Sequence, residues 1–313
     1  MKVLISNRIP EETLKKYKEN FDVDYNDSLD FLSKEELKSR LKGKDALVCP
    51  LSEKIDKEVI DAADSLKIIA NFGAGYDNVD IAYAKEKGIF VTNAPAKSSA
   101  KSVAEYTMGL IVDIMRNITS MSKEVEEGKF EGWKPVYGLG ESLEGKTLGI
   151  IGMGAIGQDL VRKALSFDMK VIFSNRSQKE VEGAGQVEKD ELLKEADIVS
   201  LHTAYSDELH HMVDKESFDK MKDTAYLINT SRGKVVSEAD LIEALKNKKI
   251  KGACLDVYEF EPEVSDELKN LDNVLLLPHL GNASYQARSE MAEYTFKNVM
   301  DVKEGRTPAN KVN

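Results

Sequence analysis

Histidine is the side chain best suited to give a proton to a carbonyl oxygen near neutral pH, because imidazole changes charge in that range. The chain has four histidines, His202, His210, His211 and His279. His279 lies in the segment Leu277-Pro-His-Leu-Gly281, where a predicted strand ends. Ligands of open α/β sheets bind outside the carboxyl ends of the strands, so this position favours His279 as a proton donor.

The other three histidines have weaker claims. His202 follows the predicted strand Ile198–Leu201 and could line a cofactor cleft, although polar packing is the role that its position favours. His210 and His211 are adjacent, and two neighbouring residues of a regular element do not both face one metal ion. Because no cluster of cysteines or further histidines accompanies them, the sequence predicts no metal site.

Charged residues follow two other predicted strands. Arg232 comes after Leu227-Ile-Asn-Thr-Ser, and Asp256 and Glu261 lie in Leu255-Asp-Val-Tyr-Glu-Phe-Glu-Pro262. An arginine fork suits the carboxylate of an α-keto acid, and a carboxylate beside His279 favours the protonated imidazole. Each residue alone is more often a surface charge or a helix cap. Their joint appearance at successive strand ends favours a catalytic constellation.

A glycine-rich turn, Gly152-Met-Gly-Ala-Ile-Gly157, joins the predicted strand Thr147–Ile151 to the helical pattern Gln158–Phe167. Gly152 permits the tight turn, Gly154 lets the backbone approach a pyrophosphate, and Gly157 allows close packing of helix on strand. The helix N-terminus then offers free N–H groups to the phosphates. We therefore predict dinucleotide binding, the alternative being a purely structural turn.

The second strand of this region, Lys170–Ser174, runs into Asn175-Arg-Ser177. NAD-preferring domains place an acidic residue here to bind the ribose 2′-hydroxyl. A carboxylate would repel a 2′-phosphate, whereas Arg176 can pair with it in bidentate fashion and Ser177 can donate a hydrogen bond. We expect NADPH to be preferred over NADH. The alternative is a solvated turn with an incidental arginine.

Short apolar runs alternate with amphipathic segments along most of the chain, which predicts parallel βαβ units and an α/β fold. The strands expected first are Lys2–Ser6, Ala46–Cys49, Lys67–Ala70 and Phe90–Thr92, and the helices between them are Glu11–Asn20, Lys34–Lys42 and Lys57–Ala63. A long apolar stripe then predicts one helix over Lys101–Glu127, followed by a glycine-rich loop, Gly128–Gly145.

A second series of six strands follows this loop, as a dinucleotide-binding domain requires. These strands are Thr147–Gly152, Lys170–Ser174, Ile198–Leu201, Ala225–Asn229, Gly252–Leu255 and Val274–Leu277. After Gly281 there is only one predicted helix, Ser284–Val302, which is too little for a domain. We therefore expect a discontinuous substrate-binding domain, residues 1–99 plus 282–313, and a dinucleotide-binding domain, residues 100–281.

Length and composition limit the function further. The 313 residues suggest about two domains. The 44 basic and 55 acidic residues give a net charge of −11 without a basic cluster, so no nucleic-acid partner is expected. Two cysteines are too few for a disulfide scaffold. There is no apolar run long enough for a signal peptide or a membrane helix, so we expect a soluble, cytoplasmic protein.

The order of these motifs resembles the D-isomer-specific 2-hydroxyacid dehydrogenases. The segments Asn71-Phe-Gly-Ala-Gly-Tyr-Asp-Asn-Val-Asp80 and Val103-Ala-Glu105 agree with this resemblance. It implies two Rossmann-like, doubly wound parallel-sheet domains, the first completed by the C-terminal helix. It also implies a catalytic triad of Arg232, Glu261 and His279, and it assigns binding of the substrate carboxylate to the N–H groups of Ala74 and Gly75.

The resemblance also implies a set of coenzyme contacts and a homodimer joined through the long helix. The expected contacts are Ala155 and Ile156 for the pyrophosphate, Asn175, Arg176 and Ser177 for the ribose and its phosphate, Thr230, Arg232 and Asp256 for the nicotinamide, and Thr203 in the segment after Leu201. That segment lacks the proline common there. Asn175 in place of an acid resembles the glyoxylate and hydroxypyruvate reductase branch.

Together these features predict NAD(P)H-dependent reduction of a small 2-ketoacid, glyoxylate or hydroxypyruvate, to the D-2-hydroxyacid. His279 would donate the proton, Glu261 would orient it and Arg232 would orient the substrate. Two alternatives remain. One is an NAD-linked dehydrogenase acting on D-lactate-like acids or 3-phosphoglycerate. The other is a non-catalytic nucleotide-sensing regulator.

Overall fold

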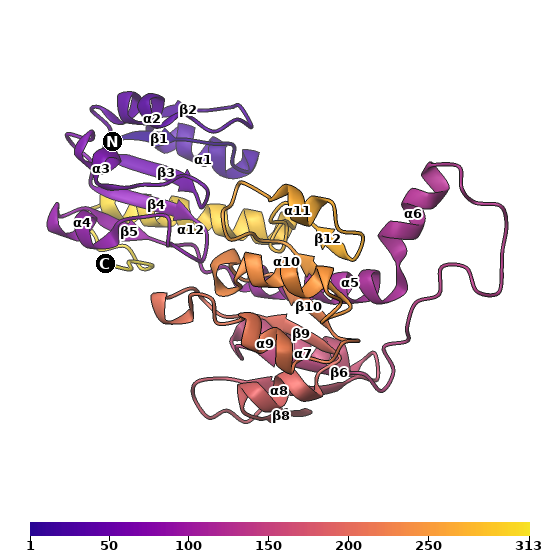
Figure 1. The fold of residues 1–313 in the computed structure, drawn as a ribbon. Coiled ribbons are helices and arrows are strands. Elements are labelled where there is room, and N and C mark those ends of the chain that lie inside the picture. Colours follow the sequence, from indigo (N-terminus) through magenta and orange to yellow (C-terminus); the bar gives the residue numbers. More distant parts are fainter. The chain divides into compact units, whose positions relative to one another are not determined.

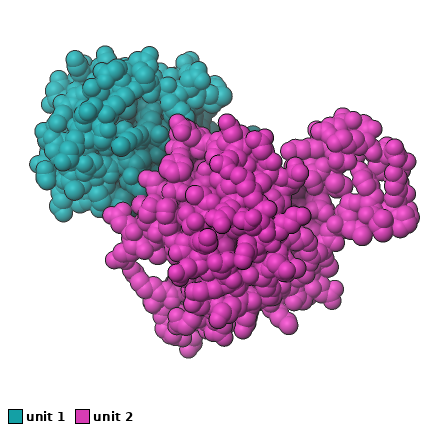
Figure 2. Space-filling view, viewed as in Figure 1, with its two compact units in different colours: residues 1–99, 283–313 teal, residues 100–282 magenta.

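The computed structural model describes residues 1–313, which divide into two compact units. The first comprises Met1–Ser99 and Ala283–Asn313, and the second comprises Ala100–Asn282 (Figure 2). Asn282 thus belongs to the second unit, whereas the boundary expected from the sequence places it in the first. Each unit contains one wholly parallel sheet with helices on its faces, and the expected fold class is confirmed.

The first unit has a five-stranded sheet in the order β2-β1-β3-β4-β5 (Figure 1). Its strands are β1 (Lys2–Ile5), β2 (Asp22–Tyr25), β3 (Ala46–Pro50), β4 (Ile68–Phe72) and β5 (Phe90–Thr92). Its helices are α1 (Glu11–Asn20), α2 (Lys34–Leu41), α3 (Lys57–Asp61), α4 (Ile81–Glu86) and α12 (Tyr285–Lys303). β2 and α4 were not predicted from the sequence, because β2 alternates acidic and apolar residues over only four positions and α4 is a helix of six residues.

Alternating side chains of these strands form two apolar layers, as expected for strands buried on both faces. Leu4, Leu47 and Ile69 pack with buried residues of α2 and α3. Val3 and Val48 on the opposite face pack with Tyr17 of α1 and Val299 of α12. The C-terminal helix therefore completes the core of the first unit, as the sequence predicted.

The second unit has a seven-stranded sheet in the order β12-β11-β10-β9-β6-β7-β8. Its strands are β6 (Thr147–Ile151), β7 (Lys170–Ser174), β8 (Ala184–Gln186), β9 (Ile198–Leu201), β10 (Tyr226–Asn229), β11 (Gly252–Leu255) and β12 (Val274–Leu276). Six of them were predicted. The edge strand β8 was not, because its three residues, Ala-Gly-Gln, have no apolar alternation.

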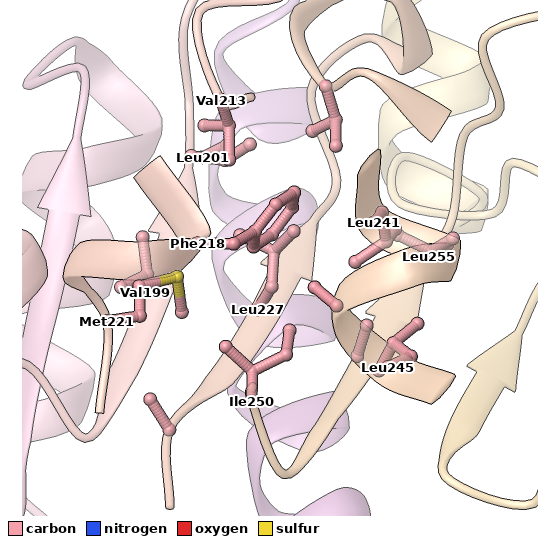
Figure 3. Close-up of a cluster of buried hydrophobic side chains, with 14 of the residues drawn as sticks. Val199, Leu201, Val213, Phe218, Met221, Leu227, Leu241, Leu245, Ile250 and Leu255 are labelled. Atoms are coloured by element: carbon pink, nitrogen blue, oxygen red, sulfur yellow. The ribbon is translucent and has the colours of Figure 1, made fainter. Parts of the chain in front are cut away.

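Helices cover both faces of this sheet, and they are α5 (Lys97–Arg116), α7 (Ala155–Leu165), α8 (Lys189–Glu195), α9 (Lys215–Lys220), α10 (Glu238–Lys246) and α11 (Asp266–Lys269). Figure 3 shows one face, where Phe218 of α9 and Leu241 of α10 pack over Leu227 of β10. On the other face α5 and α7 contribute Ile111 and Leu160. None of the helices combines the length and the apolar character needed to cross a membrane.

The single helix predicted over Lys101–Glu127 is wrong. The structure has α5, which ends at Arg116, and a separate helix α6 (Ile118–Glu126). Asn117 between them has a φ of 57°, and one residue in this left-handed conformation ends a right-handed helix. Its side chain donates to the carbonyl of Leu139 at 2.9 Å. In Figure 1, α6 and the loop after it extend away from the sheet of their unit.

Candidate active site

The carboxyl edge of the second sheet holds the residues predicted to be catalytic. β10, β11 and β12 are neighbours, and Asn229, Leu255 and Leu276 at their ends lie opposite one another in register. Arg232 follows β10, Asp256 and Glu261 follow β11, and His279 follows β12. Parallel strands have their carboxyl ends at one edge, which is why residues far apart in the sequence come to the same edge.

His279 and Glu261 form a close pair on this edge. The Nδ1 atom of His279 lies 2.7 Å from Oε1 of Glu261, and both side chains are about one-third exposed, at 33% and 36%. The backbone of His279 is left-handed, with φ 57°. Because the carboxylate engages Nδ1, the Nε2 atom is the nitrogen left to meet a substrate.

The Asp256 carboxylate holds the segment that carries His279. Its Oδ1 accepts from the N–H of Leu280 and its Oδ2 from the N–H of Gly281, both at 2.8 Å. The hydroxyl of Tyr106 on α5 donates to Oδ1 at 3.1 Å. Burial raises the pKa of this carboxyl group, and the two backbone donors oppose that rise. The nicotinamide contact expected of Asp256 stays a prediction, but its anchoring of the backbone is plain.

Arg232 lies on a segment that packs closely against the one carrying Glu261. A Cβ atom added to Gly233 would meet the carbonyl oxygen of Tyr258 at 1.8 Å, so only glycine fits there. The Tyr258 hydroxyl in turn donates to the carbonyl of Leu277 at 2.8 Å. The three segments that follow β10, β11 and β12 are thereby tied to one another. Arg232 itself donates from Nη1 to the carbonyl of Ser231 at 2.9 Å.

The glycine-rich turn has the local geometry that a dinucleotide needs. Gly152 has φ 97°, and a Cβ there would lie 2.6 Å from the carbonyl oxygen of His202. A Cβ at Gly157 would lie 2.7 Å from the carbonyl oxygen of Gly152. At Gly154, by contrast, no protein atom lies within 4 Å of the added Cβ. The turn is closed toward the protein and open beside Gly154, where α7 starts with Ala155 and Ile156.

Two polar atoms next to this turn are buried without a hydrogen-bond partner. They are Oγ1 of Thr203, whose Cγ2 would lie 3.0 Å from a Cβ at Gly152, and Nδ1 of His202. A buried polar group without a partner is costly and points to one that a ligand can supply. These atoms and the open side of Gly154 fit a bound dinucleotide. The expected coenzyme residue Thr230 pairs its hydroxyl with that of Thr107, 3.0 Å away.

The segment after β7 contains a cation, Lys179, that was not predicted from the sequence. Asn175 accepts from the N–H of Met153 at 3.1 Å and donates to Ser177, which shapes the turn. Lys179 donates from Nζ to the carbonyl of Met153 at 2.7 Å. Arg176 is exposed and makes no hydrogen bond or ion pair. A second basic residue three positions after Arg176 is the signal that could have identified Lys179.

His210 and His211 lie outside this constellation. The left-handed backbone of His211, φ 53°, stacks the two rings with centroids 3.9 Å apart, and Nε2 of His211 lies 2.7 Å from Oε1 of Glu259. His210 and His211 lie in a turn and not in a helix or strand. The reason expected to keep them from facing one ion, their place in a regular element, is therefore wrong. Their ligand atoms and that of Glu259 lie within 4.8 Å of one another. However, a metal ion lies in the plane of each imidazole that binds it. Because the His210 and His211 rings are stacked in separate planes, they are not oriented to bind one ion together.

The glycine geometry yields a pair of contrasting variants. Gly154→Ala should leave the free energy of unfolding nearly unchanged, because the new methyl group meets no protein atom, yet it should weaken coenzyme binding at least about tenfold by blocking the diphosphate. Gly152→Ala should destabilise the fold, because of its positive φ and the His202 carbonyl. Urea unfolding and fluorescence titration with NADPH measure the two effects. Equal coenzyme affinity in Gly154→Ala would contradict this placement.

His202 should make stability depend on pH. Burial lowers the pKa of His202 from 6.5 to about 4, and its Nε2 pairs with the Ser200 hydroxyl at 2.8 Å. The unfolded chain therefore binds a proton that the folded chain rejects, so stability present above pH 6.5 is lost as the pH falls toward 4. Between pH 7 and 4 the wild type should lose up to about 3 kcal/mol more than His202→Gln. Parallel losses in urea unfolding would refute this.

Comparisons with known proteins agree with this geometry. The family described as "D-isomer specific 2-hydroxyacid dehydrogenase, NAD binding domain" matches residues 108–281. A Staphylococcus epidermidis protein that carries a 2-hydroxyacid dehydrogenase name is 45% identical over 100% of this chain and 99% of its own length.

Solved structures give the same result. The TT0316 protein of Thermus thermophilus superposes with a TM-score of 0.94 at 37% identity, covering 100% of both chains. The NADPH-dependent glyoxylate/hydroxypyruvate reductase of Sinorhizobium meliloti, solved with NADP and malonate, has a TM-score of 0.87 at 28% identity, covering 99% of this chain and 96% of its own. The protein is therefore a member of the D-isomer-specific 2-hydroxyacid dehydrogenase family, and its second unit contains the NAD(P)-binding domain.

Proposed function

We propose that this enzyme reduces small 2-ketoacids, such as glyoxylate or hydroxypyruvate, to 2-hydroxyacids, with the D configuration where the product is chiral and with His279 as the proton donor. The observation that carries the proposal is the pair between Nδ1 of His279 and Oε1 of Glu261, 2.7 Å apart. A histidine held in this way presents Nε2 and keeps one ring orientation. In its protonated form this ring can give its proton to an oxygen that gains negative charge, while Glu261 holds the ring in place.

Each of the other site residues has a distinct task in this proposal. A reduced nicotinamide, when bound, supplies the hydride that reaches the carbonyl carbon. Arg232 orients the substrate and stabilises negative charge on its carbonyl oxygen through its guanidinium group. Asp256 keeps the backbone at Leu280 and Gly281 in place, and so keeps His279 where Glu261 can reach it. The N–H groups of Ala74 and Gly75 bind the substrate carboxylate.

His279→Ala should lower kcat by about 10²–10⁴-fold, because the developing alkoxide loses its proton donor. The Kd for NADPH should stay within about twofold of the wild type, since that side chain is not assigned to coenzyme binding. Glu261→Gln should lower kcat less, because the amide can still orient the ring without stabilising its charge. Steady-state kinetics and coenzyme titration make the test, with the exposed His210→Ala as the matched control. Full activity in His279→Ala would exclude it as the donor.

NADPH is proposed as the preferred coenzyme because the end of β7 carries positive charge and no carboxylate. Asn175 is neutral, and its side chain is used within the turn. Arg176 is exposed and available for a phosphate. Lys179 already lies at the glycine-rich turn, with Nζ 2.7 Å from the Met153 carbonyl. The ribose of a bound dinucleotide lies between these two segments in folds of this kind, so both cations suit a 2′-phosphate.

Arg176→Ala and Lys179→Ala should each raise the KM for NADPH about tenfold or more, because each removes a charge-assisted hydrogen bond to the 2′-phosphate. The KM for NADH should change less than about twofold. Initial rates at saturating ketoacid provide the comparison. Lys170→Ala, at the opposite end of β7, is the matched control. If the KM values for NADPH and NADH rise equally in either variant, the replaced residue only supports the turn.

A homodimer is proposed through α6 and the segment that follows it. No residue of α6 is buried within the chain, and Val125 is 56% exposed. Trp133 in the following loop is 85% exposed. Exposed apolar side chains gathered in one segment are typical of a surface that another chain covers, and a second copy would bury both segments symmetrically. The cytoplasmic location expected from the sequence stays a prediction.

A further inference from the structure

In the loop that follows β4 in the first unit, three successive backbone carbonyl groups accept hydrogen bonds from the same unit. The carbonyl of Gly73 accepts from the N–H of Ala94 at 2.7 Å. The carbonyl of Ala74 accepts from Nδ2 of Asn93 at 2.8 Å, and that of Gly75 accepts from Nδ2 of Asn71, also at 2.8 Å. Three successive carbonyl groups are thereby held by the body of the same unit.

The N–H groups of this loop are oriented by the same bonds. In a trans peptide the C=O and the N–H of one plane point in opposite directions. Holding the carbonyls of Gly73, Ala74 and Gly75 therefore turns the N–H groups of Ala74, Gly75 and Tyr76 the other way. None of these three N–H groups donates a hydrogen bond within the protein. Ala74 and Tyr76 are exposed, so the donors face outward in one short stretch.

Asn71 and Asn93 are themselves fixed. Asn71 is fully buried, and its Oδ1 accepts from Nδ2 of Asn78 at 3.1 Å. Asn78 also donates to the carbonyl of Glu53 at 2.9 Å. The backbone N–H of Asn93 bonds to the carbonyl of Asn310 at 3.2 Å. The Asn71 side chain and the Asn93 backbone are thus both held by groups of the first unit itself.

We infer that Asn71 and Asn93 are positioning residues for anion binding, and that the N–H of Tyr76 is a third donor beside those of Ala74 and Gly75. Two oxygens of a carboxylate offer about four acceptor positions, so three successive outward-facing donors suit one carboxylate. Identifying this carboxylate as that of a 2-ketoacid rests on the proposed function. We call the three N–H groups of Ala74, Gly75 and Tyr76 the cradle, and its geometry rests only on hydrogen bonds within the first unit.

The test uses Asn93→Ala and Asn71→Ala, which remove the donors to the carbonyls of Ala74 and Gly75 without adding charge. Asn26→Ala is the matched control, because the Asn26 amide is also buried and donates to backbone carbonyls, those of Ser6 and Asp30, away from this loop. The probe is oxamate, a carboxylate analogue of a 2-ketoacid, titrated calorimetrically into the full-length enzyme saturated with NADPH. Ketoacid KM, kcat and NADPH Kd are measured alongside.

Each positioning variant should raise the Kd for oxamate and the KM for the ketoacid about tenfold, with kcat within about threefold and the NADPH Kd unchanged. Asn26→Ala should bind oxamate as the wild type does. In the wild type, oxamate should slow hydrogen exchange at the amides of Ala74, Gly75 and Tyr76. A lower kcat, a higher KM and a lowered Tm together would indicate a merely structural role and overturn the inference.

Other outcomes separate this inference from the proposed function. If the wild type binds oxamate but turns over no ketoacid, and Asn93→Ala still weakens oxamate, the proposed activity fails and the cradle stands. If the wild type does not bind oxamate, or a folded Asn93→Ala binds it equally well, the cradle is wrong whatever the activity. Should the buried Asn71→Ala fail to fold, Asn93→Ala decides the question alone, because Asn93 is only partly buried.

Discussion

The Asp256 carboxylate accepts from the N–H groups of Leu280 and Gly281 at 2.8 Å, and this arrangement determines where His279 can be. Asp256 follows β11 and His279 follows β12, so these two hydrogen bonds join segments that the parallel sheet brings together. In this position His279 has a left-handed backbone, which is an unfavourable conformation for a residue other than glycine. The same edge of the sheet holds the hydrogen-bonded pair of His279 and Glu261. It also holds the close packing of Gly233 against the Tyr258 carbonyl.

Much of this edge could be predicted from the sequence, because buried parallel strands appear as short apolar runs and chemistry is found where they end. Arg232, Glu261 and His279 each follow such a run. The glycine-rich turn was identifiable for a similar reason, since a strand precedes it and a helix follows. Elements without an apolar pattern were missed, as with the edge strand β8, and the left-handed Asn117 divided a helix whose apolar stripe runs on without a break.

Residues that act through backbone contacts could not be predicted in the same way. Lys179, Asn71 and Asn93 bond to the carbonyls of Met153, Gly75 and Ala74. Nothing in a polar side chain's identity indicates which distant carbonyl it will reach, because that depends on how the chain folds. The two units nevertheless use one physical device. In each, side chains fix the backbone so that the groups facing a ligand are already oriented, which lowers the cost of binding.

The most direct test of the account is to measure initial rates and the product's handedness with NADPH and NADH, against glyoxylate, hydroxypyruvate, pyruvate and a branched 2-ketoacid. We expect the fastest oxidation of NADPH with glyoxylate or hydroxypyruvate, and D-glycerate as the product of hydroxypyruvate. A clear preference for NADH would contradict the roles of Arg176 and Lys179. No turnover with any pair, or an L-product, would contradict the assignment of the enzyme as a D-specific 2-ketoacid reductase.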